Sequence, residues 1–157
     1  MKRYDQLIKR YARQYDFNWK LIKMQVLVES GGDPYTVSSV GARGLMQITS
    51  QVWERFGSGS IFNPADNIQA GCRYLNWLYN KFSEVSDEKE RFKFALAAYN
   101  AGCQNIKKLI ARAKKAGYTA PDWETACRFL PQITGEKARE TIGYVNKVMN
   151  GYYLEEE

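Results

Sequence analysis

The sequence contains no histidine among its 157 residues. This absence excludes a Ser-His-Asp triad and a Cys-His pair, and it removes the nitrogen ligand that zinc sites most often use. Cysteine is scarce too, with only Cys72, Cys103 and Cys127. These three form no closely spaced metal-binding pair, and their odd number leaves at least one unpaired. We therefore expect no metal ion, no cofactor and no required disulfide, and we expect Cys72 and Cys103 to behave as small buried apolar residues.

Long apolar runs are also missing. The sequence has no run of about 18 apolar residues, the length that would cross a membrane. Its first residues, MKRYDQLIKRYARQ, contain no apolar stretch of the length found in signal peptides. We expect no membrane span, and no signal peptide is visible. Delivery would then depend on a removed leader, a longer parent protein or another route.

Alternation of apolar and polar residues, which marks strands, is not sustained anywhere in the chain. Apolar residues instead recur at helical spacing, so we predict an all-α fold of seven to eight helices in a single domain over residues 1–157, frayed at 155–157. Asn18 is expected to cap a helix from Trp19 to Glu29. Asn63-Pro64 should open the longest helix, and Pro131 should end a short one.

An excess of positive charge is the most evident feature of the composition. The net charge of +6 and the isoelectric point near 9.2 indicate an anionic partner such as nucleic acid, a membrane surface or an anionic polymer, although such charge can also simply keep a protein soluble. The basic residues are spread along helix faces and match no recognition motif, so we expect no nucleic-acid partner.

Glu29 is a lone carboxylate at the end of an apolar helical run, and the helix-ending pair Gly31-Gly32 follows after Ser30. Burial among apolar neighbours and the negative end of the helix dipole both raise the pKa of such a carboxyl, which favours a proton donor near neutral pH. The alternative is an ordinary exposed glutamate. The irregular segment that follows favours function, because long loops without a helical or strand period are more often functional than idle.

Five motifs occur in an order that is known from one protein family. They are Glu29-Ser30, Ser38-x-x-Gly41-Ala42-x-Gly44-Leu45-Met46-Gln47, Asn67-Ile68-x-x-Gly71-x-x-Tyr74-Leu75, Ala98-Tyr99-Asn100-Ala101-Gly102 and Glu140-Thr141-x-x-Tyr144-Val145. Over roughly residues 4–150 the chain resembles the catalytic domain of the soluble-type lytic transglycosylases. The segment from Asp122-Trp123 through Leu130-Pro131 is most similar to the membrane-bound lytic murein transglycosylases of type F.

The resemblance implies a goose-type, lysozyme-like helical domain with a substrate groove. It also implies an enzyme that cleaves the β-1,4 bond between N-acetylmuramic acid and N-acetylglucosamine without water, forming 1,6-anhydromuramic ends, with Glu29 as acid and then base. The partner would be the glycan strands of peptidoglycan, and we expect a monomer. The location would be the cell envelope, in the periplasm or at the inner face of the outer membrane, or a phage virion.

The resemblance also assigns roles to the loop after Glu29. Ser38 and Gln47 would hydrogen-bond the sugar near the cleaved bond, and Met46 would line the groove. A surface amide is the alternative for Gln47. Ser30 is interpreted as structural support.

Three further residues come from the later motifs. Tyr99 and Asn100 would bind or orient the substrate, although Asn100 could be only a helix cap. Tyr144 resembles the family tyrosine whose hydroxyl reaches the catalytic carboxylate, with core packing as its alternative.

The residues themselves favour a mechanism with one carboxylate. Ordinary glycoside hydrolysis uses two carboxylates flanking the bond. The motifs around Glu29 supply one, because Asp33 precedes a proline in a turn and is expected to accept a backbone hydrogen bond. The substrate would then supply the N-acetyl oxygen and the attacking 6-hydroxyl. A goose-type lysozyme, which hydrolyses the same bond, and a non-catalytic glycan-binding module are the alternatives.

Overall fold

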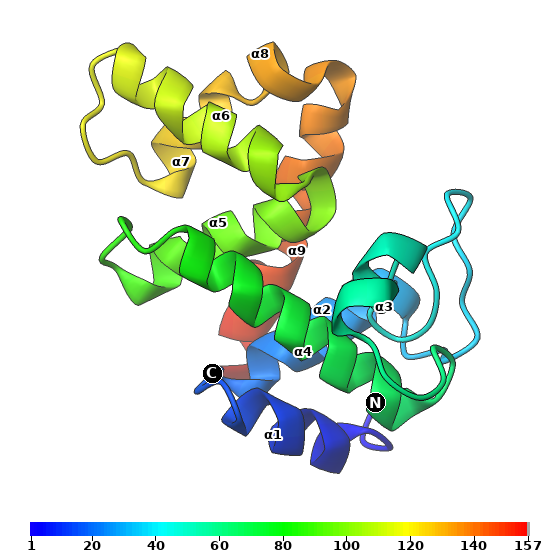
Figure 1. Ribbon diagram of the computed structural model, residues 1–157. Coiled ribbons are helices and arrows are strands. Elements are labelled where there is room, and N and C mark those ends of the chain that lie inside the picture. Colours follow the sequence, from blue (N-terminus) through cyan, green and yellow to red (C-terminus); the bar gives the residue numbers. More distant parts are fainter. Residues whose placement is uncertain (157) are drawn as a thin grey trace. The chain divides into compact units, whose positions relative to one another are not determined.

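The computed structural model describes the backbone of residues 1–156 and the side chains of residues 1–154 (Figure 1). Within this range the chain forms α-helices, two short 3-10 helices and two isolated β-bridges, without longer strands. The elements are α1 (Asp5–Arg13), α2 (Trp19–Ser30), α3 (Ser50–Phe56), α4 (Pro64–Lys81), α5 (Glu88–Ala101), α6 (Cys103–Lys115), α7 (Trp123–Ala126), η1 (Cys127–Phe129), α8 (Pro131–Thr134), η2 (Gly135–Lys137) and α9 (Ala138–Glu156). The all-α prediction is confirmed.

Side-chain caps explain where several helices begin. Asn18 precedes α2, and its Oδ1 accepts the backbone N–H of Lys20 at 3.0 Å. Asn63 accepts the N–H of Asp66 at 3.1 Å at the start of α4. Each cap satisfies one of the backbone donors that the first helical turn leaves unpaired. Both caps were predicted from the sequence and are confirmed.

Two predictions about the helices differ from the structure. The longest helix is α9 with 19 residues, not α4 with 18. Pro131 begins α8 instead of ending a helix, because a proline in a first turn needs no backbone N–H and already has a helical φ. The backbone of α9 is helical through Glu156, and residue 157 lies outside the described residues; the fraying expected at 155–157 stays a prediction.

Backbone contacts divide the chain into two compact units. Unit 1 comprises residues 1–76 and the carboxyl-terminal part from Lys147 on, and unit 2 comprises Trp77–Asn146. Helices α4 and α9 contribute residues to both units. The single domain expected over residues 1–157 stays a prediction.

Unit 1 contains α1 packed against α2 (Figure 1). Its core includes Ile8 from α1 and Ile22 and Val26 from α2, all with 0% exposure. Cys72 of α4 lies in the same core, and burial raises its pKa to about 12. Cys72 is thus the buried apolar residue that was predicted, whereas Cys103 is only half-buried.

Unit 2 is organised around α5, which packs against α6 (Figure 1). The ring of Phe94 lies 6.2 Å from that of Phe82 and contacts Trp123 edge-on at 5.6 Å. The carboxylate of Glu90 accepts the backbone N–H of Trp123 at 2.8 Å and pairs with Lys93 at 2.9 Å. These contacts fix the start of α7 to the side of α5.

The loop between α2 and α3, residues 31–49, is held to α4 by one side chain, Asn67, which is fully buried. Its Oδ1 accepts the N–H of Met46 at 2.8 Å. Its Nδ2 donates to the carbonyl oxygens of Arg43 at 3.0 Å and Ile61 at 2.7 Å. The amide thereby bonds three backbone groups of the interior, of which the Arg43 carbonyl oxygen also accepts the N–H of Ile48 at 2.9 Å.

Two glycines allow this close approach. Gly44 has a positive φ of +79°, and a Cβ on it would clash with the amide of Asn67. A Cβ on Gly71, one helical turn further along α4, would clash with the sulfur of Met46. The loop can therefore lie directly on α4 only with glycine at both positions.

We expect Asn67→Ala to lower the free energy of unfolding by about 3 to 5 kcal/mol, because three buried hydrogen bonds are lost, although the Arg43 carbonyl oxygen keeps its bond from the N–H of Ile48. The matched control is Asn63→Ala, the same change four residues earlier, which removes one exposed cap and should cost about 1 kcal/mol. Urea unfolding of both variants measures the difference. Equal losses would show that Asn67 does not anchor the loop.

Candidate active site

Glu29 lies in the last turn of α2, and its side chain is half-buried. The helix ends sharply after it, because Gly31 takes a φ of +64° and its N–H returns to the carbonyl oxygen of Leu27 at 2.9 Å. The hydroxyl of Ser30 donates to the carbonyl oxygen of Val26 at 3.0 Å, which is the structural role predicted for it. The Glu29 carboxylate therefore lies in the last turn of a helix with a well-defined C-terminus, next to the start of the loop.

Asp33, the next carboxylate along the chain, is used by the loop. Its Oδ1 accepts the backbone N–H of Tyr35 at 2.9 Å. This is the local turn bond that the sequence predicted, and it is typical of aspartate before a turn. Asp33 thus has a structural reason for its place.

Ser38 closes a second turn of the same loop. Its N–H donates to the carbonyl oxygen of Ala42 at 2.9 Å, and its Oγ accepts the N–H of Ala42 at 3.1 Å. The turn contains Gly41, with a φ of +83°. Antiparallel bridges join Arg43 to Val37 and to Ile48 just beyond it. Ser38 is half-buried, and its hydroxyl hydrogen can still be donated to a ligand.

Gln47 is held in an uncommon backbone conformation, with a φ of +51°. Its Nε2 donates to the carbonyl oxygens of Thr36 at 3.1 Å and Gly44 at 3.0 Å. Both acceptors are carbonyls, so the nitrogen end of the amide must face them. What Gln47 can offer to a sugar is therefore its carbonyl oxygen, which accepts a hydrogen bond from a hydroxyl or an acetamido N–H.

Met46 does not lie where we expected. We predicted that it lines the groove, but its side chain has 0% exposure and packs against Gly71 of α4. The missing side chain at Gly71 leaves a space that the methionine fills, so Met46 is a core residue of unit 1.

Asn100 is exposed at the end of α5, and a hydrogen bond fixes its side chain. Thr141 of α9, which is 2% exposed, donates its hydroxyl to Asn100 Oδ1 at 2.7 Å. The acceptor end of the amide is thereby engaged, which leaves the two N–H donors for a ligand. The fourth and fifth sequence motifs meet in this bond, within unit 2.

The two predicted tyrosines also belong to unit 2. Tyr99 is half-buried on α5, and Tyr144 is 6% exposed on α9. The expected bond from the Tyr144 hydroxyl to Glu29 joins residues of different units and stays a prediction. The predicted residues thus fall into two groups: Glu29, Ser38, Met46 and Gln47 in unit 1, and Tyr99, Asn100 and Tyr144 in unit 2.

Sequence reasoning missed two residues, Asn67 and Thr141, that hold others in place. Both are buried polar residues inside the quoted motifs, Asn67 before Ile68 and Thr141 after Glu140. A polar residue in an otherwise apolar helical stripe was the available signal, because buried polar groups are almost always paired.

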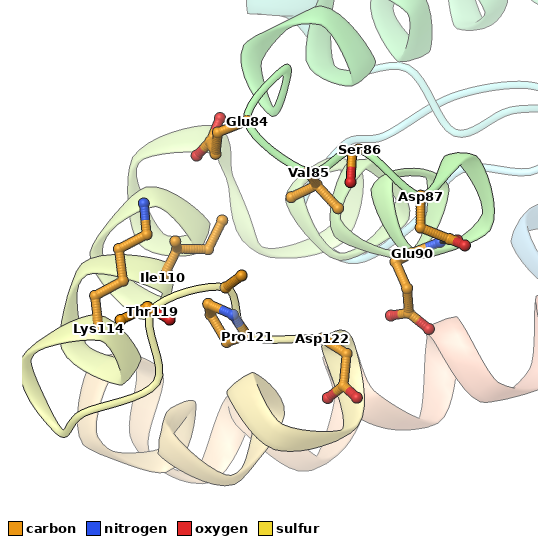
Figure 2. A pocket seen from close by; sticks show the side chains of 11 residues that line it. Glu84, Val85, Ser86, Asp87, Glu90, Ile110, Lys114, Thr119, Pro121 and Asp122 are labelled. Carbon is orange, nitrogen blue, oxygen red and sulfur yellow. Dashed lines mark hydrogen bonds between the residues drawn. The ribbon is translucent and has the colours of Figure 1, made fainter.

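Unit 2 also contains a separate hollow, of about 360 Å³, that belongs to neither group (Figure 2). Three of its four acidic residues, all except Glu84, have structural partners. Asp87 caps α5, Asp122 caps α7 through Thr125 N at 2.8 Å, and Glu90 holds Trp123. The bonds from Thr125 lower the pKa of Asp122. These carboxylates are accounted for by helix starts.

Neither a metal site nor a membrane span is visible in the part of the chain that the structure describes. No three Cys, Asp or Glu side chains there are grouped so that they could hold a metal ion. No described helix combines the length and apolar character needed to cross a membrane.

Solved structures share this fold. The crystal structure of the 70 kDa soluble lytic transglycosylase from Escherichia coli aligns with a TM-score of 0.74 and 29% identity, covering 96% of this chain and 24% of that chain. A complex of the 70 kDa soluble lytic transglycosylase with bulgecin A aligns with a TM-score of 0.77 and 28% identity, covering 97% and 24%. The fold is that of the lysozyme-like lytic transglycosylases, as predicted.

Residues 6–120 match the family described as the transglycosylase SLT domain, and the chain belongs to this family. Among its relatives is a membrane-bound lytic murein transglycosylase F from Desulfosudis oleivorans, 29% identical over 97% of this chain and 36% of that protein. Another, from Maricaulis maris, is 32% identical over 92% of this chain and 32% of that protein. The chain thus spans about a third of the length of these relatives. Their names agree with the resemblance to type F.

Thr141→Val should weaken cleavage of murein, the polymer in the relatives' names, while lowering the free energy of unfolding by only about 1 kcal/mol, because valine keeps the shape and removes the hydroxyl. Thr141→Ser should restore activity. If Thr141 acts through Asn100, the valine change should have little further effect in an Asn100→Ala background. Additive losses in this double-mutant cycle would contradict the positioning role.

Proposed function

We propose that this chain is a catalytic domain that cleaves the glycan strands of peptidoglycan as a lytic transglycosylase. The bond cleaved is the β-1,4 bond between N-acetylmuramic acid and N-acetylglucosamine, and the product carries a 1,6-anhydromuramic end. The observation that carries the proposal is the placement of Glu29 on a terminated helix end beside a loop fixed by Asn67, within the family match over residues 6–120.

Glu29 is the catalytic group in this proposal. It protonates the leaving glycosidic oxygen, and the C–O bond at the anomeric carbon breaks. The resulting carboxylate then takes the proton of the 6-hydroxyl as that oxygen bonds to the anomeric carbon. The proton count balances without water, because one group gives a proton and recovers one. The N-acetyl oxygen of the substrate stabilises the positive charge between the two steps.

The engagement of Asp33 supports a mechanism with one carboxylate. A hydrolase of the usual kind would need a second carboxylate across the bond. Asp33, the nearest in sequence, instead accepts the N–H of Tyr35. The last turn of α2 also contains no basic residue, so no side chain of that turn offsets the negative end of the helix dipole. This arrangement supports the role of proton donor that we propose for Glu29.

The remaining residues would bind the sugars. Gln47 would present its carbonyl oxygen, Ser38 its hydroxyl hydrogen and Asn100 its amide hydrogens, because their other polar groups are engaged within the protein. Tyr99 and Tyr144 are assigned to the same substrate on the family resemblance. The cell envelope, where peptidoglycan lies, is the proposed location, and we propose that the domain acts as a monomer.

A goose-type lysozyme remains the alternative within the same fold, and the products separate the two. We expect mass spectrometry of muropeptides after digestion to show 1,6-anhydromuramic ends, which are lighter than hydrolysed ends by one water. Reducing muramic ends would identify a hydrolase. A strand length unchanged by the protein would indicate a glycan-binding module instead.

We expect Glu29→Gln to lower turnover at least about a hundredfold, because it keeps the size of the side chain and removes the titrating proton. Its melting temperature should stay close to that of the original protein. The matched control is Asp33→Asn, which keeps an oxygen for the N–H of Tyr35 and should retain most activity. A Glu29→Gln variant with more than about a tenth of the original turnover would mean that another group is the acid.

A further inference from the structure

Basic charge is concentrated at the amino-terminal end of the chain. Residues 2–23 contain seven of the 23 Lys and Arg residues but only two of the 17 Asp and Glu residues. This segment therefore carries five of the six net positive charges. The rest of the chain, which holds Glu29 and the other motif residues, is close to neutral.

Part of this charge surrounds a hollow in unit 1, of about 720 Å³, between α1 and the start of α2. We call it the basic hollow. Its lining consists of Lys9, Arg13, Asp16, Phe17, Asn18, Trp19 and Lys20. Three cations against one carboxylate make this lining suited to an anion.

The cations are arranged around an indole ring. Lys9 Nζ lies 4.4 Å from the centre of the Trp19 ring, and Arg13 is exposed. Among the described side chains, neither Lys9 nor Arg13 forms an ion pair with a carboxylate. Lys23 also approaches Trp19, at 5.5 Å, but it is paired with Asp5 at 3.3 Å. Lys9 and Arg13 are therefore available to a ligand.

The start of α2 adds to the positive potential. The first turn of this helix contains no acidic residue, so the positive end of its dipole is not offset by a side chain. Asn18 caps the N–H of Lys20 and also donates to the hydroxyl of Tyr152 at 3.1 Å, which ties this corner of the hollow to α9.

The shape of the region argues against a membrane surface as the partner. The apolar face of α1, with Ile8, Tyr11 and Ala12, is buried in unit 1 and has no surface to insert into lipid. The cations also line a concavity, which a flat bilayer would not fill. A flexible anionic chain can enter it.

We propose that the basic hollow binds the carboxylates of the peptide stems carried by peptidoglycan strands. This inference rests on the proposed function, because it takes peptidoglycan as the substrate and adds a second point of contact. The ligand class is a short acidic peptide attached to the sugar that Glu29 acts on.

The dimensions fit such a ligand. Trp19 and Glu29 lie ten residues apart on α2, which corresponds to about 15 Å of helix rise. An extended peptide of five residues spans at most about 17 Å. The separation along the helix axis therefore does not exceed the length of such a stem.

The test compares two variants with the same charge change. One carries Lys9→Gln, Arg13→Gln and Lys20→Gln, and the control carries Lys107→Gln, Lys108→Gln and Lys115→Gln, three exposed positions on α6. Binding is measured on ice to intact peptidoglycan, to glycan strands stripped of their stems by an amidase, and to anionic phospholipid vesicles. Melting temperatures confirm that both variants fold.

We expect the basic hollow variant to bind intact peptidoglycan about tenfold more weakly at low salt, since three ion contacts at the protein surface are lost. The control variant should bind nearly as the original protein does, and both variants should bind stripped glycan equally. Turnover of short stem-free oligosaccharides should be unchanged in the basic hollow variant.

Three results would overturn the proposal. Equal weakening in both variants would mean that only net charge matters, and weakening on stripped glycan would assign the hollow to the sugar backbone. A loss confined to vesicles would assign it to a membrane. Binding ratios do not depend on the product formed, so a failure of the proposed transglycosylase reaction would show separately, in the mass spectrum of the products.

Discussion

The buried amide of Asn67 is the interaction on which the candidate site in unit 1 depends. It spans three backbone groups of two loops, at 2.7 to 3.0 Å, from a position inside α4. An irregular loop cannot satisfy its own backbone groups as a helix does, so a long loop near a core needs partners from outside. Asn67 supplies them, and Gln47 can then hold its left-handed conformation over the carbonyls of Thr36 and Gly44.

The same principle operates in unit 2 on a smaller scale. Thr141 is buried, and its hydroxyl fixes the amide of Asn100, which is exposed. In both units a buried polar side chain fixes part of a candidate site, the loop backbone in unit 1 and the exposed Asn100 in unit 2. A motif residue can therefore contribute without touching the substrate. When it fixes the rotamer of a neighbouring side chain in advance, that side chain loses less conformational entropy on binding.

Capping residues close to the helix ends made most of the helices predictable from the sequence. The features that depend on tertiary packing were not predictable in this way. Asn18 and Asn63 cap helices through bonds to residues two or three positions away, which a sequence pattern contains. Pro131 carried an ambiguous signal, because proline fits a first turn as well as it stops a helix. Met46 could not be placed from its neighbours, since its burial depends on the missing side chain of Gly71, 25 residues later.

Helix α2 links the two inferences about function. One end carries the basic hollow and an N-terminus without acidic residues, and the other carries Glu29 without a basic residue in the last turn. The positive end of the helix dipole then favours an anion at the first end, and its negative end lies at Glu29. The proposed substrate has a matching charge arrangement, because its acidic peptide would lie at the positive end of α2 and its neutral glycosidic bond at the negative end. In the proposed function, this single helix would orient such a substrate by charge, while the loop fixed by Asn67 would bind the sugar.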